Sequence, residues 1–488
     1  MTTAPLPLSS THAGIGRELI QLPQERRIKL LALVCLIFFT TCGGAFGLEP
    51  LIGAVGASWA AILIVVTPLV WSLPTALMVA ELTSLMPEEG GYYVWIRESF
   101  GSFWAVQQAC WTMALSSVWL AMFPVLFVSY LAFLIPELTM SAAATHPGQG
   151  ALLRWLVAVL VVVAGMGLNL RGSKEVGRSA KVSACFVLGA FALLLLVWLK
   201  RGPAPGAIVE IFGHDIASIH KGALLLGLSY AIFNFSNWED ASTYAGEVDQ
   251  PQRNYPRALA MALLVMVLCY LVPVLAGISV TTDPMIWNSD AGWPVISKLI
   301  GGRWLGNLIA VAGLVSTFGL FNAQLLYISR LPYVMASDGW LPKVFAKVSH
   351  DTAAPQLAIL CFCAIAALFA ALSFGSLAII QCILYAAALT LEFLSLIVLR
   401  IRRPEVHRNF RVPGGWWGMA YVCVTPFTFV VLVLFATLRD WESFPGQLVV
   451  VGVVALSGLV LYFVRRRAAT LRSGEGFEPL ENSPSALD

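Results

Sequence analysis

The sequence predicts an all-α integral membrane protein with 12 transmembrane helices, and composition is the first reason. The chain has 488 residues, of which 58% are hydrophobic and 12% charged, and its mean hydropathy is +0.80. Soluble domains carry about 25% charged residues, so this many apolar side chains require lipid around them. The net charge of +3 offers no basic surface for nucleic acid. We therefore expect membrane lipid, and no nucleic acid, among the partners.

The second reason is the length of the apolar stretches, because a helix needs about 20 apolar residues to cross a bilayer. Twelve stretches qualify, and glycine, proline and charged residues separate most of them. The first two are divided only by Gly53, Gly56 and Ser58. The predicted spans are 28–56, 57–85, 101–134, 150–170, 178–200, 221–246, 256–281, 303–332, 356–372, 376–400, 416–438 and 446–466.

The basic residues predict the orientation, because cytoplasmic connections are enriched in Lys and Arg. If the N-terminus is cytoplasmic, 23 of the 30 basic residues lie inside. We therefore expect both termini in the cytoplasm, on polar tails at 1–27 and 468–488, and a cell (plasma or inner) membrane location. The second tail is polar and predicts disorder. The seven basic residues left outside are Arg154, Lys200, Arg201, Lys221, Lys298, Arg303 and Arg439.

Two spans contain sequences that break a helix. The first is interrupted by Gly43-Gly44-Ala45-Phe46-Gly47, followed by Glu49-Pro50. Each glycine weakens a helix by about 1 kcal/mol and lets a ligand approach the backbone. The alternative is that the small residues only allow close helix packing.

The sixth span carries Phe235-Ser236-Asn237-Trp238-Glu239-Asp240 within apolar sequence. Asn and Ser compete for backbone hydrogen bonds, and buried carboxyls are costly inside a membrane. A helix that simply ends near Asn237, with its acids at the surface, is the alternative. Against it, residues 241–245 are compatible with a continuing helix.

The two breaks lie five spans apart, which predicts an inverted repeat. Because each unit has an odd number of spans, a duplicated five-helix unit lies upside down relative to the first. The discontinuous helix of one unit then meets that of the other near the bilayer midplane. The expected organisation is a first repeat at 28–201, an inverted second repeat at 221–401, and helices 11 and 12 at 416–467. Freed amides and carbonyls at the breaks favour binding of an ion or a charged ligand.

Several motifs resemble the amino acid–polyamine–organocation superfamily of secondary transporters, over residues 28–467. Ala80-Glu81-Leu82 and the segment 86–95, MPEEGGYYVW, resemble its AEL…PExGGYYVW signature. Segment 235–239 resembles F-S-G-x-E with Asn237 in place of glycine. Segments 246–259 and 330–342 resemble E-x-x-x-P…P-R-A-L and R…A-x-D-G-x-L-P.

Within that superfamily the chain is most similar to the polyamine-uptake subgroup of plants and protozoa. The supporting segments include 43–49, 71–74, 242–247 and 391–393. Two positions that are acidic in the plant pattern are Thr75 and Gln324 here, which weakens the case for a dication. Some proton-coupled relatives have a lysine in the fifth span at a position that is Val187 here.

The expected function is secondary active transport of amino acids or polyamines, by proton-coupled symport with alternating access. An exchanger, a membrane-embedded enzyme and a nutrient sensor are the alternatives. No HExxH motif or intramembrane histidine supports an enzyme. The sequence contains no CxxC pair that would indicate a metal site. We therefore expect no cofactor, and we expect a proton gradient to be the driving force.

The candidate site residues lie in the two breaks and the eighth and tenth spans. Glu49 either contacts a substrate amine or caps the outer half-helix. Glu239 and Asp240 point about 100° apart, and we expect Glu239 to face the cavity. Glu392 either relays a proton or forms a salt bridge, whereas Glu81 is expected to pair with the inner loops. The substrate-binding candidates are Gly43, Gly44, Ala45, Phe46, Gly47, Glu49, Phe235, Ser236, Asn237, Trp238, Glu239, Asn322 and Gln324; the proton-coupling candidates are Glu239, Asp240 and Glu392.

Overall fold

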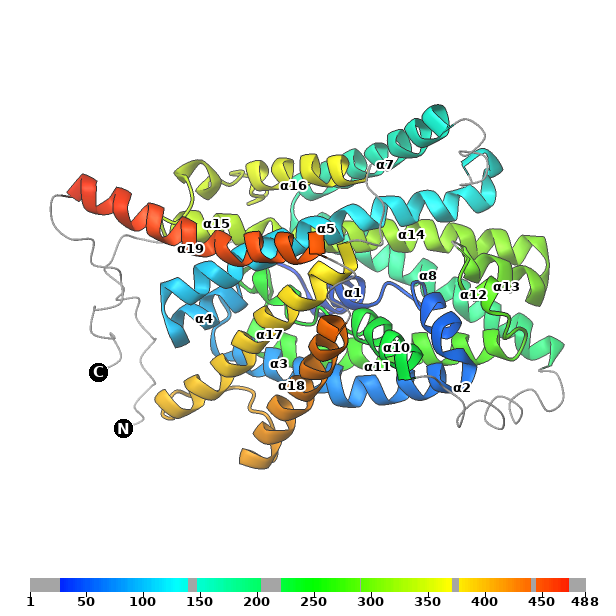
Figure 1. The fold of residues 1–488 in the computed structure, drawn as a ribbon, viewed down its shortest axis with the longest axis horizontal. Helices are drawn as coiled ribbons and strands as arrows, with labels where there is room; N and C mark the ends of the chain where they lie inside the picture. The colour runs from blue at the N-terminus through cyan, green and yellow to red at the C-terminus, as the bar shows by residue number, and fades with distance from the viewer. Residues whose placement is uncertain are drawn as a thin grey trace, which may run out of the picture.

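The structure is a bundle of helices, as the composition predicts (Figure 1). It is a computed structural model that describes residues 27–138, 147–202, 221–289, 291–370, 377–439 and 445–473. Within these residues the only β-type pairing consists of two isolated bridges, Ile28 with Val248 and Glu89 with Tyr244. Most of the predicted N-terminal tail and the end of the C-terminal tail lie outside the described residues.

Six helical segments of the described chain are long and apolar enough to cross a membrane. Two further apolar helices, α1 (Leu30–Thr41) and α16 (Gln356–Phe369), are shorter. All of these fall within or close to predicted spans, so a multi-pass membrane protein is confirmed, while the count of twelve stays a prediction. The six segments are Glu49–Leu85, Ser102–Leu134, Gln149–Leu170, Ser173–Arg201, Pro251–Ile278 and Arg303–Ser337.

The first predicted break is a real interruption of the helix. α1 ends at Thr41, and the backbone then takes positive φ at Gly43 (66°) and Gly44 (114°), a region that L side chains avoid. The chain restarts as α2 (Glu49–Thr67), with proline in its first turn. A second non-helical residue, Gly56 (φ 76°), kinks α2 at the predicted boundary between the first two spans.

The helix of the sixth predicted span also stops at its polar sequence. α10 (Lys221–Asn234) ends there, and Asn237 has a positive φ of 69°. Residues 240–247 then form 3₁₀ turns, η4 (Asp240–Thr243) and η5 (Ala245–Glu247), so the expected helical continuation is wrong. The reason is competition for its backbone carbonyls: Thr243 Oγ1 donates to Asp240 O at 2.9 Å, and the hydroxyl of Tyr255 donates to Ala241 O at 2.6 Å.

Both breaks lie in the interior of the bundle. α1 packs against α8 (Ser173–Arg201), α11 (Pro251–Ile278) and α14 (Arg303–Ile328), and Figure 1 shows it in the middle of the molecule. Leu33, Leu36 and Phe39 of α1 are fully buried. Irregular backbone is therefore surrounded by protein, as a membrane environment requires.

A π-helical turn in the second span is bonded to the break of the sixth span. The second span runs from α2 through η2 (Pro68–Ser72) into α3 (Leu73–Leu85). Within η2, Trp71 Nε1 donates to Ser236 Oγ at 3.1 Å, and Ser72 Oγ donates to Phe235 O at 3.0 Å. These bonds satisfy polar groups that the break in the sixth span exposes.

The outer surface of the bundle is apolar. Leu160 and Val182 are each 68% exposed, and Leu264 is 62% exposed. They lie on α7 (Pro147–Leu170), α8 and α11, as expected for helices that contact lipid. At the C-terminus, α19 (Pro445–Ser473) continues past residue 468, so the predicted start of the disordered tail is wrong. The apolar spacing of α19 ends near residue 468, but the Arg- and Ala-rich sequence around that residue favours helix, so α19 continues to Ser473.

Short helices in the connections were not predicted. α4 (Tyr92–Phe100), α13 (Gly292–Gly301) and α15 (Arg330–Ser337) are too short for a search based on membrane thickness. α4 and α15 are joined by an ion pair between Arg97 and Asp338, 2.6 Å apart.

Glu81 anchors the second span to the tenth, confirming its predicted structural role. Arg400, near the end of α17 (Leu377–Arg402), donates two hydrogen bonds to it, that from Nε at 2.8 Å. Val412 N donates to the same carboxylate at 2.7 Å, and Arg408 lies 3.2 Å away. This buried pairing fixes the position of α17, which carries part of the site described below.

Candidate substrate site

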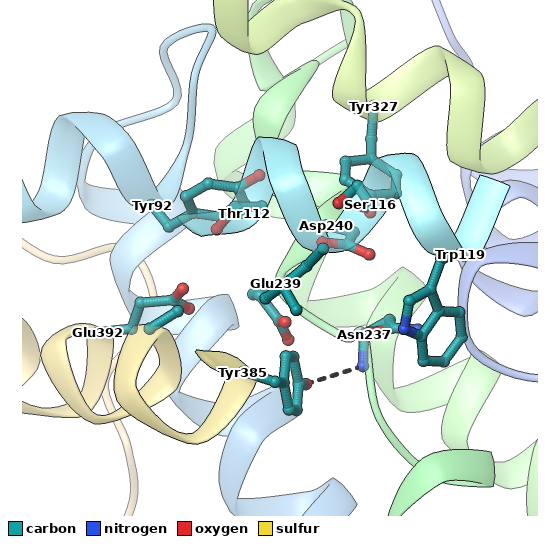
Figure 2. A pocket seen from close by; sticks show the side chains of 12 residues that line it. Tyr92, Thr112, Ser116, Trp119, Asn237, Glu239, Asp240, Tyr327, Tyr385 and Glu392 are labelled. Carbon is teal, nitrogen blue, oxygen red and sulfur yellow. Dashed lines mark hydrogen bonds between the residues drawn. The ribbon is translucent and has the colours of Figure 1, made fainter. Parts of the chain in front are cut away.

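A cavity with several polar residues in its lining lies beside the break of the sixth span. Figure 2 shows carboxylates and tyrosines converging on it from α4, the break itself and α17, while α5 (Ser102–Leu134) contributes hydroxyl groups and a tryptophan. The end of α14 also contributes Tyr327. The lining residues are Tyr92, Thr112, Leu115, Ser116, Trp119, Asn237, Glu239, Asp240, Tyr327, Tyr385, Ala388 and Glu392.

Three buried carboxyl groups face this cavity. Glu239, Asp240 and Glu392 are 3%, 4% and 2% exposed. One oxygen of each has no hydrogen-bond partner within the described residues, and no Lys or Arg of that part forms an ion pair with any of them. Buried carboxylates in this state require a proton or a bound cation.

Tyrosines hold the first two acids in place. Tyr385 lies against Glu239, and its hydroxyl accepts a hydrogen bond from Asn237 N at 3.1 Å. Tyr327 lies against Asp240 and shares a 2.6 Å hydrogen bond with Ser116. Both adjacent acids therefore line the cavity, although we expected only Glu239 to do so. The expectation assumed an α-helix, but α10 ends at Asn234 and Asn237 takes a positive φ of 69°, so the α-helical angle between adjacent side chains does not apply here.

The carbonyls of the first break are bonded to neighbouring helices. Ser316 Oγ donates to Gly43 O, and Trp293 Nε1 donates to Ala45 O at 2.7 Å. Asn234 Nδ2 donates to Gly47 O at 3.0 Å. Gly43, Gly44, Ala45, Phe46 and Gly47 are not among the residues that line the cavity.

The amides of this break are also largely occupied. Gly43 N donates to Phe38 O at 2.8 Å, and Gly44 N to Cys42 Sγ at 3.3 Å. Gly47 N donates to Glu49 Oε2 at 2.7 Å. In this conformation these amides are not free to bind a substrate carboxylate.

Glu49 lies away from the cavity. Besides the amide of Gly47, the hydroxyl of Tyr130 donates to it at 3.3 Å. A Cβ added at Gly292 would lie 2.8 Å from Glu49 Cγ, so α13 covers it closely. These contacts tie Glu49 to the amide of Gly47, which lies before the start of α2, and both roles expected for Glu49 stay predictions.

The other predicted residues stabilise the surroundings of the cavity. Trp238 Nε1 donates to Phe235 O at 2.9 Å, and Phe235 packs edge-on against Tyr270. Asn322 accepts a hydrogen bond from Asn169 at 3.0 Å. The side-chain polar atoms of Gln324 have no partner within the described residues.

Sequence reasoning named Glu392 of α17, but it missed Tyr385 on the same helix and the residues that α5 contributes. Thr112 and Ser116 are four residues apart on an apolar helix, so they share a face, and both line the cavity. Tyr385 and Glu392 are likewise seven residues apart, or two turns of α17. Regular spacing of polar residues within apolar spans was the signal that could have found them.

A second acidic cluster lies beyond η5. Arg330 Nε donates to Glu247 Oε1 at 2.8 Å, and both side chains are buried (1% and 2% exposed). Glu89 lies nearby in the connection between α3 and α4. Burial, followed by the charge of Glu247, raises the pKa of Glu89 to about 8, while Arg330 opposes the shift.

The bundle of apolar helices, the two helix breaks and the buried acidic cavity are typical of a multi-pass membrane transporter. The chain belongs to the amino acid permease family, whose model matches residues 28–455. This places it in the superfamily that its motifs resemble.

Relatives at high coverage agree with this assignment. The chain is 35% identical over 440 residues to the polyamine transporter PUT1 of Oryza sativa subsp. japonica, covering 89% of this chain and 78% of the relative. It is 33% identical over 447 residues to the polyamine transporter RMV1 of Arabidopsis thaliana, covering 90% and 85%. It is 26% identical over 337 residues to the D-serine/D-alanine/glycine transporter of Escherichia coli (strain K12), covering 65% and 71%.

Proposed function

We propose that this protein is a secondary active transporter of small organic amines, with polyamines as the preferred substrates. The observation that carries the proposal is the cavity in which Glu239, Asp240 and Glu392 converge without a basic partner among the described residues. Three acids in a low-dielectric site favour a cationic ligand. Polyamine transport by the relatives PUT1 and RMV1 supports the same substrate class.

An amino acid substrate is the second candidate, supported by the more distant serine, alanine and glycine transporter. Its carboxylate would need free backbone amides at the first break. Because the amides of Gly43, Gly44 and Gly47 already donate within the protein, the structure favours an amine without a carboxylate.

Proton coupling is the proposed driving force. A carboxyl that is neutral when empty and ionised when a cation binds links proton movement to substrate movement. Glu239, Asp240 and Glu392 are the candidates, because each is buried and lines the cavity. Exchange of one amine for another is the alternative.

The proposed architecture is a 5+5 inverted repeat with two further helices, twelve spans, and both termini in the cytoplasm. Breaks at Thr41–Glu49 and at Asn234–Asp240, five predicted spans apart, support this arrangement. Labelling of single cysteines introduced into alternate connections tests it.

Uptake into proteoliposomes tests the function. We expect labelled putrescine to accumulate when an inward proton gradient is imposed, and excess leucine or alanine to leave that uptake unchanged. Glu239→Gln should lower putrescine uptake by at least about tenfold, because it removes a buried charge that pairs with the ligand. Accumulation of no amine or amino acid would refute transport, and strong competition by leucine or alanine would refute the polyamine preference.

A further inference from the structure

Glu392 lies in the cavity but apart from the residues at the helix break. It projects from α17 two turns after Tyr385, the residue that contacts Glu239 and Asn237. Two turns place the Cα atoms of residues 385 and 392 about 10 Å apart along the helix. In Figure 2, Glu392 and Tyr92 stand together on one side, while Asn237 and Trp119 stand on the other.

One oxygen of Glu392 is held and the other is free. Gln108 Nε2 on α5 donates to Glu392 Oε1 at 3.1 Å. The same Gln108 amide nitrogen is 3.2 Å from Thr112 Oγ1, so both of its hydrogens have acceptors. Glu392 Oε2 has no partner within the described part of the chain, although the residue is 2% exposed.

Two further buried oxygens near Glu392 lack partners within the described residues. They are Gln108 Oε1 and the Tyr92 hydroxyl, and both residues are 0% exposed. Tyr92 lines the cavity together with Glu392, whereas Gln108 is not among the lining residues. Glu392 Oε2 and the Tyr92 hydroxyl are therefore two unpaired oxygens of cavity residues that can accept hydrogen bonds. A primary ammonium group carries three N–H donors and no acceptor, so the chemistry of the donors matches that of the acceptors.

Electrostatics also favours a second cation. Glu392 lies close enough to Glu239 and Asp240 for their charges to interact. One ammonium group contacts a carboxylate only within about 4 Å. One ammonium group can neutralise at most one of the three carboxylates, so the remaining acids, Glu392 among them, must be protonated or bind a second charge.

We infer that Glu392 and Tyr92 form a subsite for a second ammonium group, which makes the protein select dications over monocations of the same length. This rests on the proposed amine transport, because it assigns the far end of the same site. Glu239 and Asp240 bind the first ammonium group, and Glu392 binds the second. Gln108 positions the Glu392 carboxylate by donating a hydrogen bond to its Oε1.

The test compares putrescine with N-acetylputrescine, which has the same chain but only one ammonium group. Binding of both is measured on the full-length protein in detergent, by competition against labelled putrescine. We expect the wild type to bind putrescine at least tenfold more tightly. Glu392→Gln should weaken putrescine binding by about 30-fold or more and leave N-acetylputrescine unchanged, so the discrimination is lost.

Two variants serve as controls. Tyr92→Phe keeps the aromatic ring and removes one acceptor, so it should reduce the same discrimination by a smaller factor. It also provides a test if Glu392→Gln does not fold. Glu175→Gln alters an acid in the first turn of α8, which pairs with Arg178 at 3.1 Å. It should leave the binding of both ligands unchanged.

The outcomes separate this inference from the proposed function. If the wild type takes up putrescine but Glu392→Gln discriminates as strongly as the wild type, the second-ammonium subsite is wrong. If Glu392→Gln keeps that discrimination and loses only its response to a pH gradient, Glu392 is a proton carrier and the subsite is again wrong. If the wild type neither binds nor transports an amine, the proposed function itself fails.

Discussion

Removal of the Glu81 carboxylate is expected to destabilise the protein strongly. Glu81 is fully buried and receives hydrogen bonds from Arg400 and from the backbone of Val412. Arg408 lies 3.2 Å from the same carboxylate. Glu81→Gln keeps the shape of the side chain but removes the negative charge between two arginines.

The magnitude follows from the burial of the partners. Arg400 is 4% exposed at its side chain, so it cannot regain full hydration when its partner becomes neutral. Breaking a buried ion pair by removing one partner costs about 3–5 kcal/mol. The matched control is Glu175→Gln, whose partner Arg178 is 65% exposed; such surface pairs contribute about 0–1 kcal/mol.

Equilibrium unfolding in mixed micelles measures both variants. We expect Glu81→Gln to lower the free energy of unfolding by about 3–5 kcal/mol and Glu175→Gln by less than about 1 kcal/mol. The double variant Glu81→Gln/Arg400→Gln should be less unstable than the sum of its single variants, because it leaves one buried charge fewer. If Glu81→Gln lowers the free energy of unfolding as little as Glu175→Gln does, the pairing of Glu81 with Arg400 does not hold α17 in place.

Two further predictions concern the connection between α3 and α4. Gly91 has a φ of 40°, and a Cβ there would lie 2.0 Å from Ser242 Oγ and 2.6 Å from its carbonyl carbon. Gly91→Ala should therefore cost at least about 1–3 kcal/mol, seen as a lower melting temperature in detergent; an unchanged value would contradict this packing. The pKa of Glu89 is raised from 4.5 to about 8, so the folded protein binds this proton more tightly than the unfolded chain does. Its stabilising effect is complete below pH 4.5 and is lost as the pH rises through 8. Glu89→Gln should thus lose less melting temperature than the wild type across pH 8, and equal losses would show that Glu89 does not titrate there.

The helix breaks were predictable because their cause is local. Gly43 and Gly44 take backbone angles that other residues avoid, and Asn237 tolerates a positive φ. Each of these properties belongs to a single residue and its neighbours. The sequence therefore indicated where α1 and α10 would stop.

The partners of the buried acids were not predictable, because they depend on contacts between distant segments. Gln108 and Glu392 are 284 residues apart, and Glu81 and Arg400 are 319 apart. Glu49 shows the same limit. Sequence spacing placed it beside the first break, but only the tertiary structure shows its carboxylate bonded to Gly47 and Tyr130, under α13 and outside the cavity.

The sequence by itself determined that this is a helical membrane protein with two interrupted spans and a few costly acids at membrane depth. Those conclusions follow from hydropathy and glycine geometry, which act over a few residues. The tertiary structure decided which acids meet. Packing of α5, α17 and the break after α10 brings Glu239, Asp240 and Glu392 to one cavity, because buried charges are tolerated only where several segments jointly supply hydrogen bonds and room for a cation.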